Sequence, residues 1–360
     1  MTAPHAIEQP AALPDGEALL PTGTQEVSVP VFTLPVEGES ITSTFTGNTY
    51  RIGPVIGEGS FGVVYECTDT WGNPLAVKIL KPLGTYEQVR DSAIAELEKL
   101  RLLRHPNVTY VHDAFEFRHT FYIVFERCWQ PINQFIQRDQ FNGHLWLRAI
   151  ARHILQAVHF LHCNDYVHQD IHGGNVFVAT RSDDMAPNDM IFTFMLGDLG
   201  ITKMVTEMDA QNTVLAEWMR APEALAPAEY GPMDHRMDIY HCGLLFLQIL
   251  LGHPLTFTTD EVLGGVPREV ALRVGGPFSF ALEKALRRHV EFRTASALEF
   301  WGDLNTTACS RCPEIALTPR SRGPPASCAC RFAPAFGLRP PPAPELERWA
   351  SSKTISLFER

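Results

Sequence analysis

The chain has 360 residues, 45% of them hydrophobic, which is enough for one globular domain with appended segments. A formal net charge of −11 argues against a nucleic-acid binder, whose surface would be basic, so we expect no nucleic-acid partner. The eight cysteines favour reduced thiols over a disulfide framework, because no export signal accompanies them.

The N-terminal region, residues 1–48, is predicted to be a disordered arm. It contains six prolines and six acidic residues but no basic residue, and such a composition buries too little apolar surface to order itself. Its first 20 residues lack the basic start and apolar run of a secretory signal, so we expect a cytoplasmic protein. The proline-rich arms at both ends are candidate binding sites for adaptor proteins.

Residues 50–79 are predicted to form successive antiparallel strands. The segment alternates and is rich in Val and Ile, with a turn expected at Trp71-Gly72-Asn73-Pro74. Within it, Ile56-Gly57-Glu58-Gly59-Ser60-Phe61-Gly62 forms a glycine-rich loop between two strands. Glycines let backbone N–H groups approach phosphate oxygens, although the same spacing also occurs in dinucleotide folds and plain turns. A following strand, rather than a helix, disfavours the dinucleotide interpretation.

Lys78 lies in the apolar strand that follows, and a charge in that position needs a partner. Glu96 on the next predicted helix is the candidate, and Glu98 on a different face of that helix competes with it. The plain alternative is an edge-strand lysine that points to water.

The second part of the domain is predicted to be mainly helical. Apolar residues recur at helical spacing from Ile94 to Leu103 and from Leu147 to Leu161. The apolar run at 243–251 is too short to cross a membrane, so we interpret it as a buried helix and expect no membrane span. Strands followed by helices imply an α+β fold of two lobes with a cleft between them.

Two further segments carry polar groups suited to phosphate chemistry. In the run from Tyr166 to Val178, Asp170 and Asn175 are five residues apart, and they could hold an incoming hydroxyl and a divalent metal. Asp198 follows the apolar stretch that ends at Leu196, and magnesium binds phosphate oxygens together with one or two carboxylates.

Together these segments resemble the signature set of eukaryotic-type protein kinases, in order and at similar spacing from about Tyr50 to Trp301. The resemblance implies a kinase domain over residues 49–302, with a small antiparallel sheet and one regulatory helix in the N-terminal lobe. A larger helical lobe and an ATP cleft complete it. Its implied activity is phosphoryl transfer from ATP with Mg²⁺ to protein serine or threonine.

Roles follow from the resemblance by position. Asp170 would be the catalytic base, with Lys78, Glu96 and His172 beside it, while Asn175 and Asp198 would bind magnesium. The ATP-binding residues would be Ile56, Gly57, Gly59, Ser60, Phe61, Gly62, Val64, Ala76, Lys78, Glu126, Cys128 and Phe177, the hinge being Tyr122 to Cys128. Further along, Glu223 and Arg293 match a pair that is buried in kinases.

Three positions depart from the family pattern. Gln169 replaces an arginine that, in the family, binds a phosphate on the activation loop. Its absence predicts activity without phosphorylation of that loop. A neutral sequence change at this position is the alternative. His172 replaces a lysine that contacts the transferred group, and Ala216 replaces the threonine that contacts that lysine. Both changes bear on the class of hydroxyl acceptor.

Two other functions stay open. The His-Gly-Gly-Asn run at 172–175 also resembles small-molecule phosphotransferases of the aminoglycoside and choline type. A nucleotide-binding pseudokinase scaffold is the third possibility, which the presence of Lys78, Asp170 and Asp198 disfavours.

The C-terminal tail, residues 303–360, has nine prolines and is predicted to be disordered. Its thiols Cys309, Cys312, Cys328 and Cys330 could bind zinc, but their spacing favours free thiols. We expect the other four, Cys67, Cys128, Cys163 and Cys242, in core or hinge positions.

Overall fold

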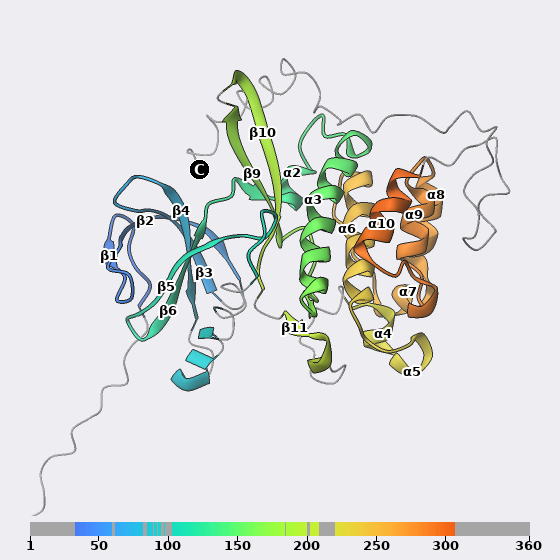
Figure 1. The fold of residues 1–360 in the computed structure, drawn as a ribbon, viewed down its shortest axis with the longest axis horizontal. Helices are drawn as coiled ribbons and strands as arrows, with labels where there is room; N and C mark the ends of the chain where they lie inside the picture. Colours follow the sequence, from blue (N-terminus) through green and yellow to red (C-terminus); the bar gives the residue numbers. More distant parts are fainter. Residues whose placement is uncertain are drawn as a thin grey trace, which may run out of the picture.

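The computed structural model describes residues 33–59, 62–81, 85–88, 90, 91, 93, 94, 97, 103–183, 185–199, 202–208 and 220–306. In this part of the chain, a sheet lies at one end of the molecule and a helical region at the other (Figure 1). Glu96, Ser60, Phe61, Ala216 and the tail cysteines, which carried predictions above, lie outside the described residues.

The first region is a six-stranded antiparallel sheet with strand order β1-β2-β3-β4-β6-β5. Its strands are β1 (Ser40–Thr42), β2 (Thr49–Glu58), β3 (Gly62–Thr68), β4 (Pro74–Leu80), β5 (Val111–Phe117) and β6 (Thr120–Glu126). The predicted turn between β3 and β4 is confirmed, because the Asp69 carboxylate accepts from the N–H groups of Trp71 and Asn73, both at 2.9 Å, and Gly72 has φ +81°.

Ordered structure begins inside the predicted N-terminal arm. In β1, Ile41 is 1% exposed and is paired in register with Tyr50. The average composition of residues 1–48 could not reveal β1, because this strand is only three residues long and buries one side chain, that of Ile41. At the other end, α10 (Ala297–Asn305) extends beyond the predicted boundary at residue 302, since Leu304 is also buried.

The second region is mainly helical, with two small sheets at its border with the first. Its helices are α2 (Ile132–Phe135), α3 (Gly143–Cys163), α4 (Pro222–Leu225), α5 (Pro227–Tyr230), α6 (Arg236–Leu251), α7 (Thr259–Gly264), α8 (Val266–Val274), α9 (Ser279–Ala285), α10 and the 3-10 turns η1 (Val205–Glu207) and η3 (Val290–Phe292). The border strands are β7 (Gln130–Pro131), β8 (Tyr166–Val167), β9 (Val176–Asp183), β10 (Ala186–Leu196) and β11 (Lys203–Met204).

Helix α3 confirms the predicted amphipathic helix, and it packs closely on α6. Its N-terminus is capped by the side chain of Asn142, which accepts from His144 and Leu145. A Cβ at Gly143 would lie 2.0 Å from the carbonyl oxygen of Ile249 on α6, so only glycine permits this crossing. Helix α6 is buried on almost every side, as the apolar run predicted, and no described helix is long and apolar enough to cross a membrane.

Each region has its own hydrophobic core. Residues of β1 to β6 form the cores of the sheet, and residues of α2, α3, α6, α9 and α10 form the core of the helical region. The two-lobed α+β fold predicted from the sequence is therefore confirmed. The border between the lobes is where the predicted site residues lie.

Candidate active site

The glycine-rich segment forms the hairpin between β2 and β3. The N–H of Gly59 donates to the carbonyl oxygen of Gly62 over 2.9 Å. A Cβ at Gly62 would lie 2.7 Å from the carbonyl oxygen of Ile79, so the close approach of β4 requires glycine there. At Gly59 a Cβ would meet no atom within 4 Å, which leaves the hairpin open on that side.

One face of the sheet carries three of the predicted nucleotide-binding residues: Val64, Ala76 and Lys78. Val64 pairs in register with Lys78, and Gly62 pairs with Leu80. Because side chains two positions apart on a strand share a face, Ala76 and Lys78 lie on the same side of β4, together with Val64. Ala76 is buried at 8% exposure, whereas Ile56 on β2 is 46% exposed.

Lys78 contacts Asp198 across the border between the lobes. Its Nζ lies 3.3 Å from Asp198 Oδ1, and the Lys78 side chain is 13% exposed. The predicted partner Glu96 and its competitor Glu98 lie outside the described residues. The structure thus joins the lysine of the sheet to the carboxylate that follows β10.

Asp170 and Asn175 meet in the loop between β8 and β9. The Asn175 amide nitrogen donates to Asp170 Oδ2 over 2.8 Å and to the Asp170 carbonyl oxygen over 3.0 Å. His172 Nε2 lies 3.6 Å from Asp170 Oδ1, and His172 Nδ1 accepts from the N–H of Gly174 over 3.0 Å. That acceptor role places the ring proton on Nε2, facing Asp170.

The Asp170 carboxyl has a pKa below its ordinary value. Burial alone would raise the pKa, but the contact with His172 and the nearby rings of His168 and His241 outweigh burial. The carboxylate is therefore ionised at neutral pH, ready to accept a hydrogen bond from a hydroxyl group.

Two hydrogen bonds connect this loop to the Asp198 segment. The N–H of Gly197 donates to the carbonyl oxygen of Asn175 over 2.8 Å, and His168 Nε2 lies 3.1 Å from the carbonyl oxygen of Gly197. Lys78, Asp170, Asn175 and Asp198 therefore form one connected group.

The backbone is held in an unusual conformation at both ends of this group. Gln169 has φ +70° and Asp198 has φ +57°, a left-handed region that non-glycine residues adopt at a cost of about 1 kcal/mol or more. Such conformations persist where the surroundings enforce them, and they concentrate at functional sites.

Asp238 on α6 holds the Asp170 loop and was given no role in the sequence analysis. It is 0% exposed, and its carboxylate accepts from the N–H groups of His168 and Gln169, both over 2.8 Å. It also contacts His162 Nε2 at 2.9 Å. A carboxylate within the apolar sequence of α6 was the available signal, because a buried charge needs partners.

Phe177 and the hinge complete the predicted nucleotide site. Phe177 on β9 is half-buried, and a Cβ at Gly197 would lie 2.7 Å from its ring. At the hinge, Glu126 Oε1 accepts from the N–H of Tyr110 over 2.6 Å. The main chain of Cys128 forms no hydrogen bond with another described residue, which leaves its N–H and C=O for a ligand.

The residues predicted to hold magnesium fit a hard cation. The Asn175 nitrogen is used by Asp170, so its amide oxygen is the atom left for a ligand. Asp198 supplies a carboxylate, and oxygen donors of these two kinds are the ones that magnesium prefers. Elsewhere in the described residues, no group of three or more His, Cys, Asp or Glu could hold a metal ion.

The cysteine predictions are partly confirmed. Cys67 and Cys242 are buried and Cys128 is half-buried, and all four described cysteines are free thiols. The prediction was wrong for Cys163, which is exposed at the C-terminal end of α3. Burial raises the pKa of the Cys128 thiol to about 12, so it is a weak nucleophile.

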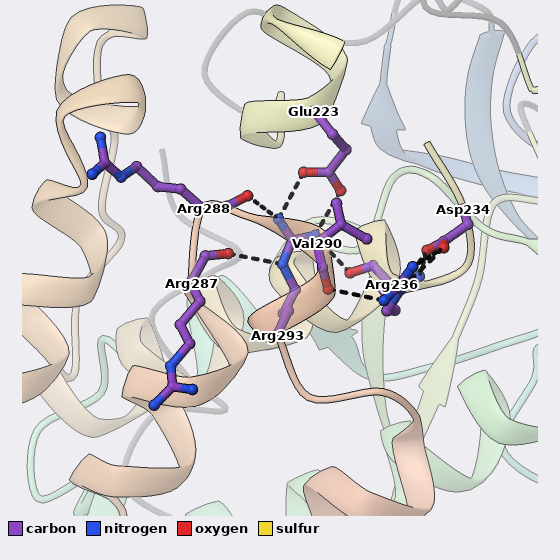
Figure 2. A network of polar contacts seen from close by, with 7 residues as sticks. All are labelled: Glu223, Asp234, Arg236, Arg287, Arg288, Val290 and Arg293. Atoms are coloured by element: carbon purple, nitrogen blue, oxygen red, sulfur yellow. Dashed lines mark hydrogen bonds and ion pairs between the residues drawn. The ribbon is translucent and has the colours of Figure 1, made fainter. Parts of the chain in front are cut away.

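The predicted pair of Glu223 and Arg293 is confirmed. Both side chains are 0% exposed, and two parallel hydrogen bonds of 2.6 and 2.7 Å join the guanidinium to the carboxylate. Figure 2 shows this pair at the centre of a polar network that includes Arg236 and Val290. The pair fixes α4 against the loop that follows α9.

Comparisons with known proteins agree with this geometry. A family model described as protein kinase domain matches residues 50–271. Cyclin-dependent kinase-like 5 of Mus musculus is 29% identical over 237 residues, which is 62% of this chain and 24% of that protein. Cyclin-dependent kinase-like 1 of Caenorhabditis elegans is 27% identical over 252 residues, 66% of this chain and 67% of that protein.

A plant relative shows the same pattern of partial coverage. The serine/threonine-protein kinase TIO of Arabidopsis thaliana is 26% identical over 214 residues, 59% of this chain and 15% of that protein. The match likewise spans about a quarter of the cyclin-dependent kinase-like 5 proteins of mouse and human. The similarity therefore concerns the domain described above.

Proposed function

The chain belongs to the protein kinase family, and on that premise we propose that it transfers the γ-phosphoryl group of ATP, with Mg²⁺, to serine or threonine hydroxyls of protein substrates. One observation carries the proposal. Lys78 and Asp198 are in contact at 3.3 Å, and Asn175 connects Asp198 to Asp170 through Gly197. Phosphoryl transfer needs this combination of one cation, two carboxylates and an amide, because its catalysis consists of positioning and charge neutralisation.

In this mechanism Lys78 binds the α- and β-phosphates of ATP. Its ammonium group lies on the same face of the sheet as Val64 and Ala76, which would cover the adenine ring from above while Phe177 lies beneath. Glycines at 57, 59 and 62 let the hairpin approach the phosphates.

Asp170 would orient the substrate hydroxyl and receive its proton as the new phosphate bond forms. Its lowered pKa makes the carboxylate a weak base, so the proton moves late, when the hydroxyl oxygen is already bonding to phosphorus. The hydrogen bond from Asn175 fixes Oδ2 of the Asp170 carboxylate, and the other oxygen, Oδ1, faces His172.

Asn175 and Asp198 would hold the magnesium ion, which when bound neutralises charge on the phosphates. His172 would stand beside the acceptor hydroxyl in place of the usual lysine. Its Nε2–H can donate a hydrogen bond to the transferred group but brings less positive charge than an ammonium group.

The buried pair of Glu223 and Arg293 favours a polypeptide acceptor. By the family resemblance, Arg220-Ala221-Pro222-Glu223 and the helix from Asp238 to Gly243 belong to the lobe that docks polypeptides, and the pair of Glu223 with Arg293 is formed there with both side chains fully buried. Adaptor binding through the proline-rich arms belongs to the same proposal.

The test is phosphate transfer from radiolabelled MgATP by the wild type and by Asp170→Asn. The acceptors are a generic basic protein, dephosphorylated casein and a panel of small alcohols including aminoglycosides and choline. Label on protein serine or threonine that is lost with Asp170→Asn supports the proposal. Label on small alcohols alone would identify a small-molecule phosphotransferase, and MgATP binding without transfer would identify a scaffold.

A further inference from the structure

A small basic pocket lies on the helical lobe, between α8 and the segment that follows α9. Its volume is about 240 Å³, and it is lined by Arg268, Arg287, Arg288, His289 and Phe292. In Figure 1, α8 and α9 lie at the end of the helical region opposite the sheet, whereas Lys78 lies on β4. The pocket is therefore separate from the candidate active site.

The lining residues include three arginines and no carboxylate. Glu283, 5% exposed, pairs with two of these arginines: its carboxylate accepts from Arg268 over 2.6 Å and from Arg287 over 3.0 Å. Among the residues that line the pocket, three arginines and no acid are found, in a chain whose net charge is −11. A concentrated positive site on an acidic protein attracts anions selectively.

Hydrogen-bond donors are available in the pocket. Arg268 uses only its Nε on Glu283, so within the described residues its two terminal nitrogens donate to no other group, and the side chain is 48% exposed. Arg288 Nη1 donates to the carbonyl oxygen of Leu263 over 2.5 Å, and its guanidinium lies 5.7 Å from the centre of the Tyr230 ring. Glu283 offsets part of the charge of Arg268 and Arg287, whereas these contacts of Arg288 are with uncharged groups and leave its charge in place.

The backbone beneath the pocket is fixed by the buried ion pair. Arg293 donates from Nε to the carbonyl oxygen of Arg287 over 3.0 Å and from Nη2 to that of Arg288 over 3.1 Å. Figure 2 shows the side chains of these two arginines extending away from Glu223 and Arg293, while their carbonyl groups point toward Arg293. A backbone that is held in place before binding lowers the entropy cost of ordering the pocket around a ligand.

We propose that this pocket binds the phosphate group of a phosphorylated segment of a polypeptide. A phosphate monoester has two negative charges and three acceptor oxygens, which suit a pocket lined by several arginines better than a single carboxylate does. A cavity of about 240 Å³ admits a phosphate with its side chain but is small for a nucleotide. Phe292 is 56% exposed beside it and offers an apolar contact to the flanking peptide.

The identity of that polypeptide as a substrate rests on the proposed function, but the binding itself does not. A phosphorylated substrate held on the helical lobe would be delivered to the kinase at a raised local concentration. The test therefore measures binding in the absence of ATP, so that a failure of catalysis cannot be mistaken for a failure of the pocket.

The experiment titrates a fluorescein-labelled phosphoserine peptide with the full chain and follows fluorescence anisotropy at low salt. Arg268→Gln and Arg288→Gln are the pocket variants, and Arg273→Gln is the matched control, because Arg273 lies on the same helix, 75% exposed and paired with Glu269. We expect each pocket variant to weaken binding by about tenfold or more, as expected for losing one charge-assisted contact, and the control to bind like the wild type. Circular dichroism establishes that each variant is folded, and Arg268→Gln alone suffices if Arg288→Gln does not fold.

Three further measurements distinguish binding at this pocket from binding by other routes. The unphosphorylated peptide should bind at least tenfold more weakly, and Lys78→Met should bind the phosphopeptide like the wild type. Inorganic phosphate should compete only at much higher concentration than the phosphopeptide. Equal binding by the pocket variants and the wild type would overturn the proposal, as would no phosphate-dependent binding or a free-phosphate affinity that equals that of the peptide.

Discussion

The ammonium group of Lys78 lies 3.3 Å from the carboxylate of Asp198, although 120 positions separate the two residues in the chain. The contact joins a strand of the sheet to the segment that follows β10, across the border between the two lobes. In the proposed mechanism, it is the point at which the residue that binds phosphate meets a residue that holds the metal ion.

Replacing Lys78 should remove activity and keep the fold. For Lys78→Met we expect turnover to fall by about 100-fold or more, because the cation that positions the ATP phosphates is lost. The melting temperature should change by only a few degrees, since the side chain is a partly exposed ion pair. Steady-state kinetics measure turnover and calorimetry measures the melting temperature. The control is Arg51→Met, which replaces an exposed residue of β2. Full activity in Lys78→Met would contradict the assigned role.

Gly174 should control the position of His172. A Cβ at Gly174 would lie 2.7 Å from His172 Cε1 and 3.0 Å from Nδ1, so Gly174→Ala should displace the ring from Asp170. We expect turnover to fall by about tenfold, which corresponds to roughly 1.4 kcal/mol, with little change in affinity for ATP.

The control for this change is Gly302→Ala in α10, where a Cβ meets no atom within 4 Å. Alanine there should stabilise the protein by about 0.5–1 kcal/mol and leave turnover unaltered. If Gly174→Ala turns over at the wild-type rate, the placement of His172 does not matter for transfer.

Breaking the buried pair should be costly. Arg293→Ala leaves Glu223 charged and buried, and it also removes donors from the carbonyl oxygens of Arg236, Arg287 and Arg288. We expect the free energy of unfolding to fall by about 3–5 kcal/mol, measured by urea denaturation. Arg273→Ala removes an exposed i,i+4 pair and should cost about 0.5 kcal/mol or less. Similar losses in the two variants would show that burial of the pair is unimportant.

Asp238 should make part of the stability depend on pH. Burial by itself would raise its pKa, but the hydrogen bond from His162 and the charges of His168 and His241 hold the pKa below the ordinary value. The contribution of the Asp238 carboxylate to the free energy of unfolding is therefore complete above its pKa in the unfolded chain, about 4. It is lost as the pH falls through the lower pKa that Asp238 has in the folded protein.

Asp238→Asn should thus be less stable than the wild type at pH 7. The difference between the two proteins should shrink steadily as the pH falls below about 4. Thermal unfolding from pH 7 to pH 3 measures it, and a difference that stays constant over this range would rule out the ionised carboxylate as the source.

The activation loop should not need phosphorylation. Gln169, in place of the usual arginine, is neutral and 0% exposed, with its N–H bonded to Asp238, so it offers no cation to a phosphate. Thr202→Ala, Thr206→Ala and Thr213→Ala should each keep turnover near that of the wild type in the protein-kinase assay. A collapse in rate for any of them would show that a hydroxyl in this segment is required.

Local sequence patterns determined the element types and the motif residues of this protein. The two-residue period predicted β2, β3 and β4, the helical period predicted α3, and the apolar run predicted α6. These predictions succeeded because each pattern reflects which face of one element is buried, a property of neighbouring residues. The resemblance of the segments around Asp170, Asn175 and Asp198 to kinase motifs indicated the family.

Contacts between distant segments were decided only by the tertiary structure. The ion pair of Lys78 with Asp198 spans 120 positions, and the hydrogen bond from His168 to Asp238 spans 70. The basic pocket joins α8 to the segment that follows the next helix, α9. No local periodicity encodes such contacts, because they depend on how strands register and how helices pack around two cores. The sequence therefore supplied the candidate residues, and the fold determined which of them meet.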